Sequence, residues 1–339
     1  MNISVIGATG YSGVELMRIL SDHPNANVVH AVSKNFAGKK MSDIYQSFLS
    51  CDYPLESLDI PAICADSDIV FTCLPHGTSS EVVPQLLSGG VKVIDLSGDF
   101  RYNDASVYEK WYNAKHTAAH LLEKSVYGLP ELHRDQIKQT SLVGNPGCYT
   151  TSAILALAPL LSAGLIDENS IIIDAKSGTT GAGRSEKLPL LHSEVDESFK
   201  AYGVVGHRHT SEIEQELGIA AGNEIALSFT PHLLPIKRGI LSTIYANTTA
   251  SQAQIEKAYE VYNDEPFVQI TTGLPEIKHV VGSNNCAIGY KIDERLSRII
   301  IVSCIDNLIK GAAGQAVQNM NIMCGYDETE GLNKTGWYL

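Results

Sequence analysis

Hydrophobic and polar positions alternate in two different ways along the chain. Over residues 1–145, short apolar runs such as 3–6 and 69–74 alternate with helical patterns such as 14–20. This order of strands and helices predicts a parallel, doubly wound sheet of the Rossmann type. Over residues 146–306, long β-like runs with few helices between them predict a second α+β domain with a mixed or antiparallel sheet.

Two domains also follow from length, because 339 residues exceed the size at which a single core usually stops growing. We expect residues 1–145 to form one domain and residues 146–306 to form the other. The last helical pattern, within residues 307–339, is rich in small residues that allow close packing. We therefore predict that this segment returns to the first domain.

One short stretch, Asn145-Pro146-Gly147-Cys148, lies between a strand-like run and the apolar helical run 153–161. This order places Cys148 at a strand-to-helix turn. The backbone N–H groups and the dipole at a helix start favour a thiolate over a thiol, so Cys148 is our candidate nucleophile. The alternative is a buried cysteine that acts as a small hydrophobic residue.

Glycines at positions 7, 10 and 13 lie directly between the first strand and the first helix. This G-x-x-G-x-x-G spacing allows a tight turn and a close approach of backbone to a pyrophosphate at a helix N-terminus. The second strand ends in Ser33-Lys34, without the acidic residue that typically binds an NAD ribose, so we favour NADP over NAD. The candidate cofactor residues on this half are Gly7, Thr9, Gly10, Tyr11, Ser12, Gly13, Ser33, Lys34 and Pro75.

Candidate groups for anions and protons lie in loops of both halves. Arg101 follows a strand end, and Arg184 closes a second glycine-rich loop that contains Ser177 and Gly178. The segment His207-Arg208-His209 precedes Ser211 and Glu214, whose spacing predicts a capping box and a helix from 211 to near 218. An imidazole can both accept and donate a proton near pH 7, whereas two histidines without a third ligand do not predict a metal site.

Composition narrows the class of partner and the compartment. The formal net charge of −13 disfavours nucleic acid, and the 44% hydrophobic content is ordinary for a globular protein. The seven cysteines form no C-x-x-C pair and are expected to be reduced. No apolar run is long enough to span a bilayer and no basic leader precedes one, so we expect a cytoplasmic protein without a membrane partner.

A nicotinamide cofactor and a nucleophilic cysteine together restrict the chemistry to acyl-to-aldehyde oxidation and reduction. A sulfur-bound carbon exchanges hydride with nicotinamide, and the oxidised form is a thioester. The Cys148 backbone N–H, with the Asn145 side chain or an imidazole, would hold the developing oxyanion.

Seven motifs of this chain together resemble the N-acetyl-gamma-glutamyl-phosphate reductases of arginine biosynthesis over nearly the full length. They are GATGYSG at 7–13, LPHG at 74–77, DLSGDFR at 95–101, YGLPE at 127–131, NPGCY at 145–149, GHRH at 206–209 and DNLIKGAAG at 306–314. Thr150 departs from the pattern, because many relatives have proline there.

The resemblance implies a reaction and roles for particular residues. Cys148 would displace phosphate from N-acetyl-glutamyl 5-phosphate, NADPH would reduce the thioester, and N-acetyl-glutamate semialdehyde would leave. One histidine of the pair would be the acid/base, for which we prefer His209 over His207. Asn307 would hold the nicotinamide amide, and Arg208 or Arg184 would bind the substrate's carboxylate or phosphate.

Other readings remain open from the sequence. Aspartate-semialdehyde dehydrogenase shares the architecture and the reaction, and the lysine-pathway reductases act on a substrate one methylene longer. A hydrophobic pocket discriminates one methylene by only about 1–3 kcal/mol. An NADP-binding redox sensor would use Cys148 without turnover. A homodimer or homotetramer is favoured by the small-residue helix and the large mixed sheet.

Overall fold

The computed structural model describes residues 1–338, which form two compact units. The first unit contains residues 1–146 and 312–332, and the second contains residues 147–311 and the segment from 333 onward. Of the segment 307–339, which we assigned to the first domain, residues 312–332 belong to the first unit. The final segment belongs to the second unit, where Trp337 donates its backbone N–H to the carbonyl oxygen of Val281 at 2.8 Å.

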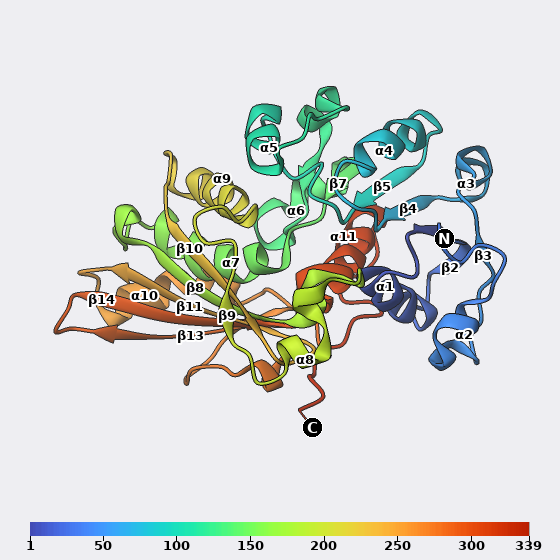
Figure 1. Cartoon of the computed structure of the whole chain (residues 1–339). Helices are drawn as coiled ribbons and strands as arrows, with labels where there is room; N and C mark the ends of the chain where they lie inside the picture. The colour runs from blue at the N-terminus through green and yellow to red at the C-terminus, as the bar shows by residue number, and fades with distance from the viewer. Residues whose placement is uncertain (339) are drawn as a thin grey trace. The chain divides into compact units, whose positions relative to one another are not determined.

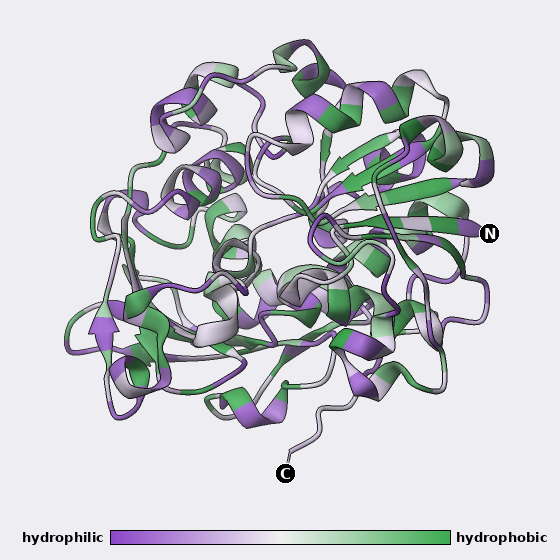
Figure 2. Cartoon of the chain, turned by 45° about the vertical axis from the view of Figure 1, so that its right-hand side comes forward, coloured by the Kyte–Doolittle hydropathy of each residue, from purple (hydrophilic) through white to green (hydrophobic). Residues whose placement is uncertain are grey.

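The first unit is built on a seven-stranded sheet in the order β3-β2-β1-β4-β5-β7-β6, with every neighbouring pair parallel. Its inner strands are almost fully buried, as expected for a sheet covered on both faces. Their hydrophobic colour is visible in Figure 2. The strands are β1 (Asn2–Ile6), β2 (Asn27–Val32), β3 (Leu55–Glu56), β4 (Ile69–Thr72), β5 (Lys92–Asp95), β6 (Val126–Tyr127) and β7 (Leu142–Gly144).

Helices connect these strands, and the last long helix of the chain joins the same unit. Asn319 on α11 (Gly314–Cys324) donates its side-chain amide to the carbonyl oxygen of Gly128, next to β6, at 2.8 Å. The other helices are α1 (Tyr11–Ser21), α2 (Met41–Ile44), α3 (Ile60–Asp66), α4 (Ser79–Ser88), α5 (Ala105–Tyr112) and α6 (Pro130–Gln139), with short 3-10 turns η1 (Gln46–Phe48) and η2 (Ala119–Lys124). This unit confirms the predicted Rossmann-type layer.

The second unit is built on another seven-stranded sheet, in the order β12-β13-β14-β11-β8-β10-β9. Two of its pairs are parallel and the others are antiparallel, so the predicted mixed sheet is confirmed. The strands are β8 (Ile172–Gly178), β9 (Lys200–Ala201), β10 (Ser228–Leu234), β11 (Ile240–Asn247), β12 (Val268–Ile270), β13 (Cys286–Asp293) and β14 (Arg298–Ile305). Figure 1 shows β8, β11, β13 and β14 as long neighbouring ribbons.

One buried helix lies at the centre of this unit. All of α7 (Cys148–Ser162) from Tyr149 to Leu161 is buried, because it packs on β11 and β14 and is flanked by α9 (His209–Ala221) and α10 (Gln252–Tyr259). The remaining elements are α8 (His192–Val195), the 3-10 turns η3 (Glu168–Ser170), η4 (Thr179–Ala182), η5 (Leu188–Leu190), η6 (Glu260–Tyr262) and η7 (Ile277–His279), and the π-helical turn η8 (Ile309–Ala313).

Candidate active site

Cys148 is the first residue of α7, so the predicted turn that presents a cysteine at a helix start is present. Gly147 is the N-cap, with extended backbone angles of φ −72° and ψ 155°. Thr151 donates its backbone N–H to the Gly147 carbonyl and closes the first helical turn at 3.0 Å. The backbone N–H groups of the first turn have no acceptor within their own helix, so they favour a negative charge on Cys148.

The turn after β14 lies directly against the nucleophile. A side chain at Gly311 would place its Cβ 2.8 Å from the Cys148 Cβ and 3.2 Å from the Cys148 Cα. Only glycine leaves the cysteine backbone where it is. Gly311 itself is held by a backbone hydrogen bond of 2.9 Å to the carbonyl oxygen of Asp306.

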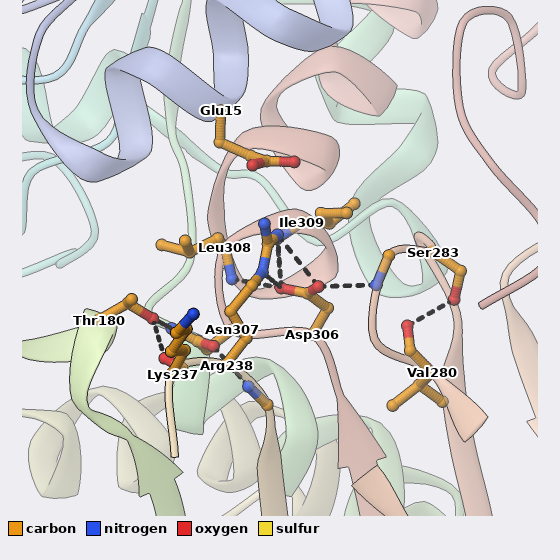
Figure 3. A network of polar contacts seen from close by, with 12 residues as sticks. Glu15, Thr180, Lys237, Arg238, Val280, Ser283, Asp306, Asn307, Leu308 and Ile309 are labelled. Carbon is orange, nitrogen blue, oxygen red and sulfur yellow. Dashed lines mark hydrogen bonds and ion pairs between the residues drawn. The ribbon is translucent and has the colours of Figure 1, made fainter. Parts of the chain in front are cut away.

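The Asp306 carboxylate is the centre of the polar network in Figure 3. It is fully buried and lies 3.0 Å from the Arg238 guanidinium. It also accepts backbone N–H groups from Leu308 and Ile309 in its own turn and from Gly282 at 2.9 Å. These contacts hold in place the turn that leads to Gly311, which is the segment that packs against Cys148.

The two histidines lie beside the residue that follows the nucleophile. The ring of Tyr149 is 5.9 Å from the ring of His209 and 5.8 Å from the ring of His207, both edge-on. His209 is the first residue of α9, and His207 accepts the backbone N–H of His209 through Nδ1 at 3.2 Å. The site therefore contains two helix starts, one with the cysteine and one with a histidine.

The predicted capping box before α9 is wrong. The helix begins at His209 and ends at Ala221, two residues earlier and three later than predicted from Ser211 and Gly218. Ser211 donates its hydroxyl to the Arg208 carbonyl, and Glu214 accepts the Leu227 backbone N–H, so neither residue caps the helix start. Ser211 is thus used by a local bond within the first turn, and Glu214 by a contact with the chain after the helix.

The surroundings of His207 keep its ring neutral. Burial and then the charge of Arg208 lower the pKa of His207 to about 4, so this ring is neutral throughout the physiological range. A base that weak is a poor match for proton transfer near neutral pH. His207 instead acts as a neutral acceptor that holds the start of α9, which favours His209 as the acid/base.

Tyr202 is a neighbour of the site that the sequence did not reveal. Its hydroxyl donates to the Tyr149 hydroxyl at 3.2 Å, and Tyr149 donates to the carbonyl oxygen of His232 at 3.1 Å. Burial raises the pKa of Tyr202 to about 12, with a further contribution from Cys148, so both phenols are neutral donors near the thiol. No motif or hydrophobic periodicity around Tyr202 predicts that it lies in the site.

The predicted anion-binding residues divide into two groups. Arg208 and Arg184 are exposed in the second unit, and Arg208 is at the N-cap of α9. In the first unit, buried Arg101 donates to the backbone carbonyl oxygens of Asn145 at 2.7 Å and Leu96 at 3.0 Å. Arg101 thus joins two turns of its own unit.

Asn145, predicted as an oxyanion donor, is also committed within the first unit. Its side-chain nitrogen donates to the Ala312 carbonyl at 3.1 Å, and its side-chain oxygen accepts from Asn319 at the same distance. It is 1% exposed. These contacts attach the end of β7 to α11 and favour a structural role.

The glycine turn of the first unit has the shape that a dinucleotide phosphate requires. Gly7 has a left-handed φ of +93°, and a Cβ there would lie 2.4 Å from the Cys73 carbonyl oxygen. A Cβ at Gly13 would lie 2.2 Å from the Gly7 carbonyl oxygen. Gly10 caps α1 without a side chain, and Tyr11 and Ser12 form the first helical turn. The missing side chains at Gly7 and Gly13 therefore let the turn pack tightly against its own sheet and helix, as in a dinucleotide-binding turn.

Ser33 and Lys34 directly follow the end of β2. Ser33 is buried and its hydroxyl lies 2.8 Å from the Thr9 hydroxyl, which ties the strand end to the glycine turn. Lys34 is exposed next to it. Pro75 is exposed just after β4, at the carboxyl edge of the same sheet. These residues fit NADP(H).

The second glycine-rich loop and Asn307 interlock in the second unit. Asn307 accepts the Gly239 backbone N–H at 2.7 Å and donates to the Thr180 hydroxyl at 3.0 Å, as Figure 3 shows in part. Gly178 packs so tightly that a Cβ would lie 2.7 Å from the Lys237 carbonyl, and Ser177 bonds the Gly178 carbonyl. Asn307 thus holds this loop within the second unit.

Residues 1–338 contain neither a metal-binding cluster nor a membrane-spanning helix. No cluster of three or more histidine, cysteine and acidic side chains in that range could hold a metal ion. None of the helices described there is long and apolar enough to cross a bilayer. None of the seven cysteines, all within this range, forms a disulfide.

Comparison with family models gives two matches that cover most of the chain. Residues 2–140 match the model described as semialdehyde dehydrogenase, NAD binding domain. Residues 148–307 match the model described as semialdehyde dehydrogenase, dimerisation domain.

Similar proteins and structures agree with these matches. The chain is 53% identical to the N-acetyl-gamma-glutamyl-phosphate reductase of Acetivibrio thermocellus, over 100% of this chain and 99% of that protein. It is 51% identical to the reductase of the same name from Halothermothrix orenii, over 99% of both chains. Aspartate semialdehyde dehydrogenase II from Vibrio cholerae, complexed with ASA, superposes with a TM-score of 0.74 at 17% identity, covering 96% of this chain and 98% of that one. The aspartate semialdehyde dehydrogenase with NADP from Candida albicans gives 0.65 at 16% identity, over 95% and 98%.

Proposed function

The chain belongs to the semialdehyde dehydrogenase family, and we propose that it is an NADPH-dependent N-acetyl-gamma-glutamyl-phosphate reductase. It converts N-acetyl-L-glutamyl 5-phosphate to N-acetyl-L-glutamate 5-semialdehyde and phosphate, a step of arginine biosynthesis. The substrate name comes from relatives that are more than 50% identical over essentially the whole chain. The chemistry is supported independently by the site.

The single observation that supports this function is the position of Cys148. The cysteine begins a buried helix whose first-turn N–H groups favour a thiolate, and both histidine rings lie within 6 Å of the ring of the next residue, Tyr149. A thiolate beside an imidazole is the arrangement of an activated cysteine nucleophile.

The reaction begins when the Cys148 sulfur attacks the acyl carbon of the substrate. A carbon–sulfur bond forms, the bond between carbon and the phosphate oxygen breaks, and phosphate leaves with the electron pair. The product is a thioester on Cys148. The Cys148 backbone N–H lies at the helix start, where it can donate to the oxyanion that forms during the attack.

His209 supplies the proton balance. Its ring can hold the proton removed from the thiol and give it to the departing phosphate, so that one imidazole serves both directions. After reduction of the thioester carbon, the oxyanion collapses, the carbon–sulfur bond breaks and the semialdehyde leaves. The electron pair returns to sulfur, which regenerates the thiolate.

NADPH, when bound, supplies the hydride for this reduction. Gly7, Gly10 and Gly13 shape the turn that would receive its pyrophosphate, and Ser33 with Lys34 would contact its 2′-phosphate. These assignments are supported by the missing side chains in the turn and by the hydroxyl and ammonium groups at the end of β2.

We assign the exposed Arg208 and Arg184 to the substrate's anionic groups. In a chain of net charge −13, an acyl phosphate with a carboxylate must be met by local cations. Arg208 is next to both histidines in sequence and its charge acts on His207 and Tyr202. It is therefore the stronger candidate of the two.

The test is consumption of NADPH with N-acetyl-glutamyl phosphate, followed by its disappearance in absorbance. In the reverse direction, the semialdehyde should produce NADPH only when inorganic phosphate is present. Cys148→Ser should abolish both signals and leave NADPH binding, measured by fluorescence, within threefold of the unchanged protein. Turnover that persists in this variant would contradict the mechanism.

Parallel assays decide between related substrates. Aspartyl phosphate lacks the acyl group on nitrogen, and N-acetyl-aminoadipyl phosphate is one methylene longer. We expect the glutamyl substrate to have the highest kcat/KM, with the longer one reduced by roughly 10- to 200-fold. A higher kcat/KM for either alternative would move the assignment to that pathway.

We also propose that the protein works as a homodimer or homotetramer in the cytoplasm. The second unit matches a model described as a dimerisation domain, and Ile172 at the start of its inner strand β8 is 45% exposed. Seven cysteines without a disulfide suit a reducing compartment. Light scattering after size-exclusion chromatography measures the oligomeric state, and a monomer would contradict the first part.

A further inference from the structure

A buried glutamate connects the two catalytic elements. Glu212 lies in the first turn of α9, three residues after His209, and its side chain is fully buried. One of its carboxylate oxygens accepts the backbone N–H of Gly147 at 2.8 Å. A side chain from the first turn of α9 thereby binds the N-cap of the cysteine helix.

The same oxygen has a second neighbour on the cysteine helix. The Thr150 hydroxyl lies 2.9 Å from it and 2.6 Å from the Gly147 carbonyl oxygen. Glu212 therefore contacts two residues of the α7 start, Gly147 before Cys148 and Thr150 after it. Proline at position 150 has no hydroxyl and could not make this contact.

The hydrogen bond to Glu212 also fixes the direction of the Gly147 backbone N–H. The Gly147 N–H points at Glu212, so it is committed to the protein and does not serve the substrate oxyanion. The oxyanion donors must then come from the following residues of the helix start, beginning with the Cys148 N–H. A hydrogen bond to a buried carboxylate is stronger than one between neutral groups, which suits a contact that must fix geometry.

Building on the proposed function, we propose that Glu212 is a positioning residue that fixes the position of Cys148 relative to His209. It touches neither substrate nor the reacting atoms. It sets the separation of sulfur and imidazole by fixing the start of α7 against the start of α9, in the geometry that proton transfer requires.

The experiment compares Glu212→Ala, Glu212→Gln and a matched control, Glu216→Ala. Glu216 lies one turn further along α9 and is 2% exposed. Its carboxylate accepts a hydrogen bond of 2.9 Å from the side-chain amide of Gln215. Turnover is measured per reactive thiol, with thiols counted by alkylation with iodoacetamide in the folded protein. The alkylation rate of Cys148 is recorded for each variant.

Glu212→Ala should lower kcat by about a hundredfold, since a displacement of roughly 1 Å in a catalytic group costs about 10²-fold. KM and the alkylation rate should stay within threefold, because the thiol remains at a helix start and the substrate contacts are untouched. Glu212→Gln keeps an oxygen acceptor and should restore kcat to within about fivefold. Glu216→Ala should change kcat by less than threefold.

Two results would overturn the proposal. An unchanged kcat per thiol in Glu212→Ala would show that the hydrogen bond to Gly147 does not matter for catalysis. A parallel fall of alkylation and turnover would show that Glu212 serves the thiol itself and not its alignment. If the alanine variant does not fold, Glu212→Asp, which withdraws the acceptor by one carbon, gives the same comparison. Absence of activity in the unchanged protein would instead refute the proposed function.

Discussion

Gly311→Ala tests whether the close contact between Gly311 and Cys148 controls catalysis. The added methyl carbon would lie 2.8 Å from the Cys148 Cβ and 3.2 Å from the Cys148 Cα. Ordinary contacts lie at 3.4–4 Å, so the two segments must separate by at least about 0.6 Å. The Asp306 network holds one side of this contact in place, so most of the displacement falls on the start of α7.

The magnitude follows from that displacement. A misplacement of roughly 1 Å costs about 10²-fold in rate, so a shift of about 0.6 Å or more should lower kcat by roughly 10- to 100-fold. Overpacking costs about 1–3 kcal/mol, while alanine in a helical turn is favoured over glycine by about 1 kcal/mol. The free energy of unfolding should therefore fall by no more than about 2 kcal/mol.

The assay is steady-state NADPH consumption per alkylatable thiol, together with thermal unfolding. Gly273→Ala is the matched control, because a Cβ there has no described heavy atom within 4 Å and its φ is not left-handed. It should leave kcat unchanged. A kcat of Gly311→Ala within threefold of the unchanged protein, with Cys148 still reactive, would refute the argument that this contact positions the nucleophile.

Three further predictions concern proton transfer, cofactor binding and stability. His209→Asn should lower kcat by about 10²- to 10⁴-fold, whereas His207→Asn should leave the pH dependence of kcat between pH 6 and 8 unchanged, because the pKa of His207 is about 4; a shift of that profile would contradict the assignment. Gly13→Ala should raise the dissociation constant for NADPH at least tenfold in a fluorescence titration, because its Cβ would lie 2.2 Å from a carbonyl oxygen in the turn; unchanged binding would argue against the cofactor site. Burial lowers the pKa of His30, but hydrogen bonds to Glu56 and a second carboxylate outweigh it and leave the pKa above 6.5. Its stabilisation is thus fully present below pH 6.5 and lost as pH rises through the folded pKa, so urea unfolding should show His30→Gln to be destabilising at pH 6 and nearly neutral at pH 9.

The parts of the site that the sequence predicted depend on local backbone chemistry. Gly7 requires a left-handed φ and Gly13 a close approach of backbone, and glycine is the residue that meets both needs. Cys148 follows a strand and a proline–glycine pair and precedes an apolar run, so its place at a helix start can be read from neighbours within ten residues. The parallel and mixed sheets follow from the spacing of strands and helices in the same way.

The parts that the sequence did not predict depend on contacts between distant segments. Ser211 and Glu214 have capping-box spacing, yet α9 begins at His209, and Glu214 is used by the Leu227 backbone instead. Asn145 resembles an oxyanion donor in its motif, but its amide is engaged by α11 of its own unit. Glu212 carries no local signal at all, because its partner Gly147 is 65 residues away.

The meeting of two helix starts explains why a buried acid is found beside a nucleophile that must itself be an anion. Each helix start carries roughly half a positive charge, and the Gly147–Glu212 hydrogen bond joins the N-cap of α7 to the first turn of α9. One carboxylate is stabilised by this field, which makes full burial tolerable. Because the Gly147 N–H is already directed at Glu212, the attraction left for a second anion lies one residue further along α7. That is the position of Cys148, where a thiolate, and then the substrate oxyanion, would form.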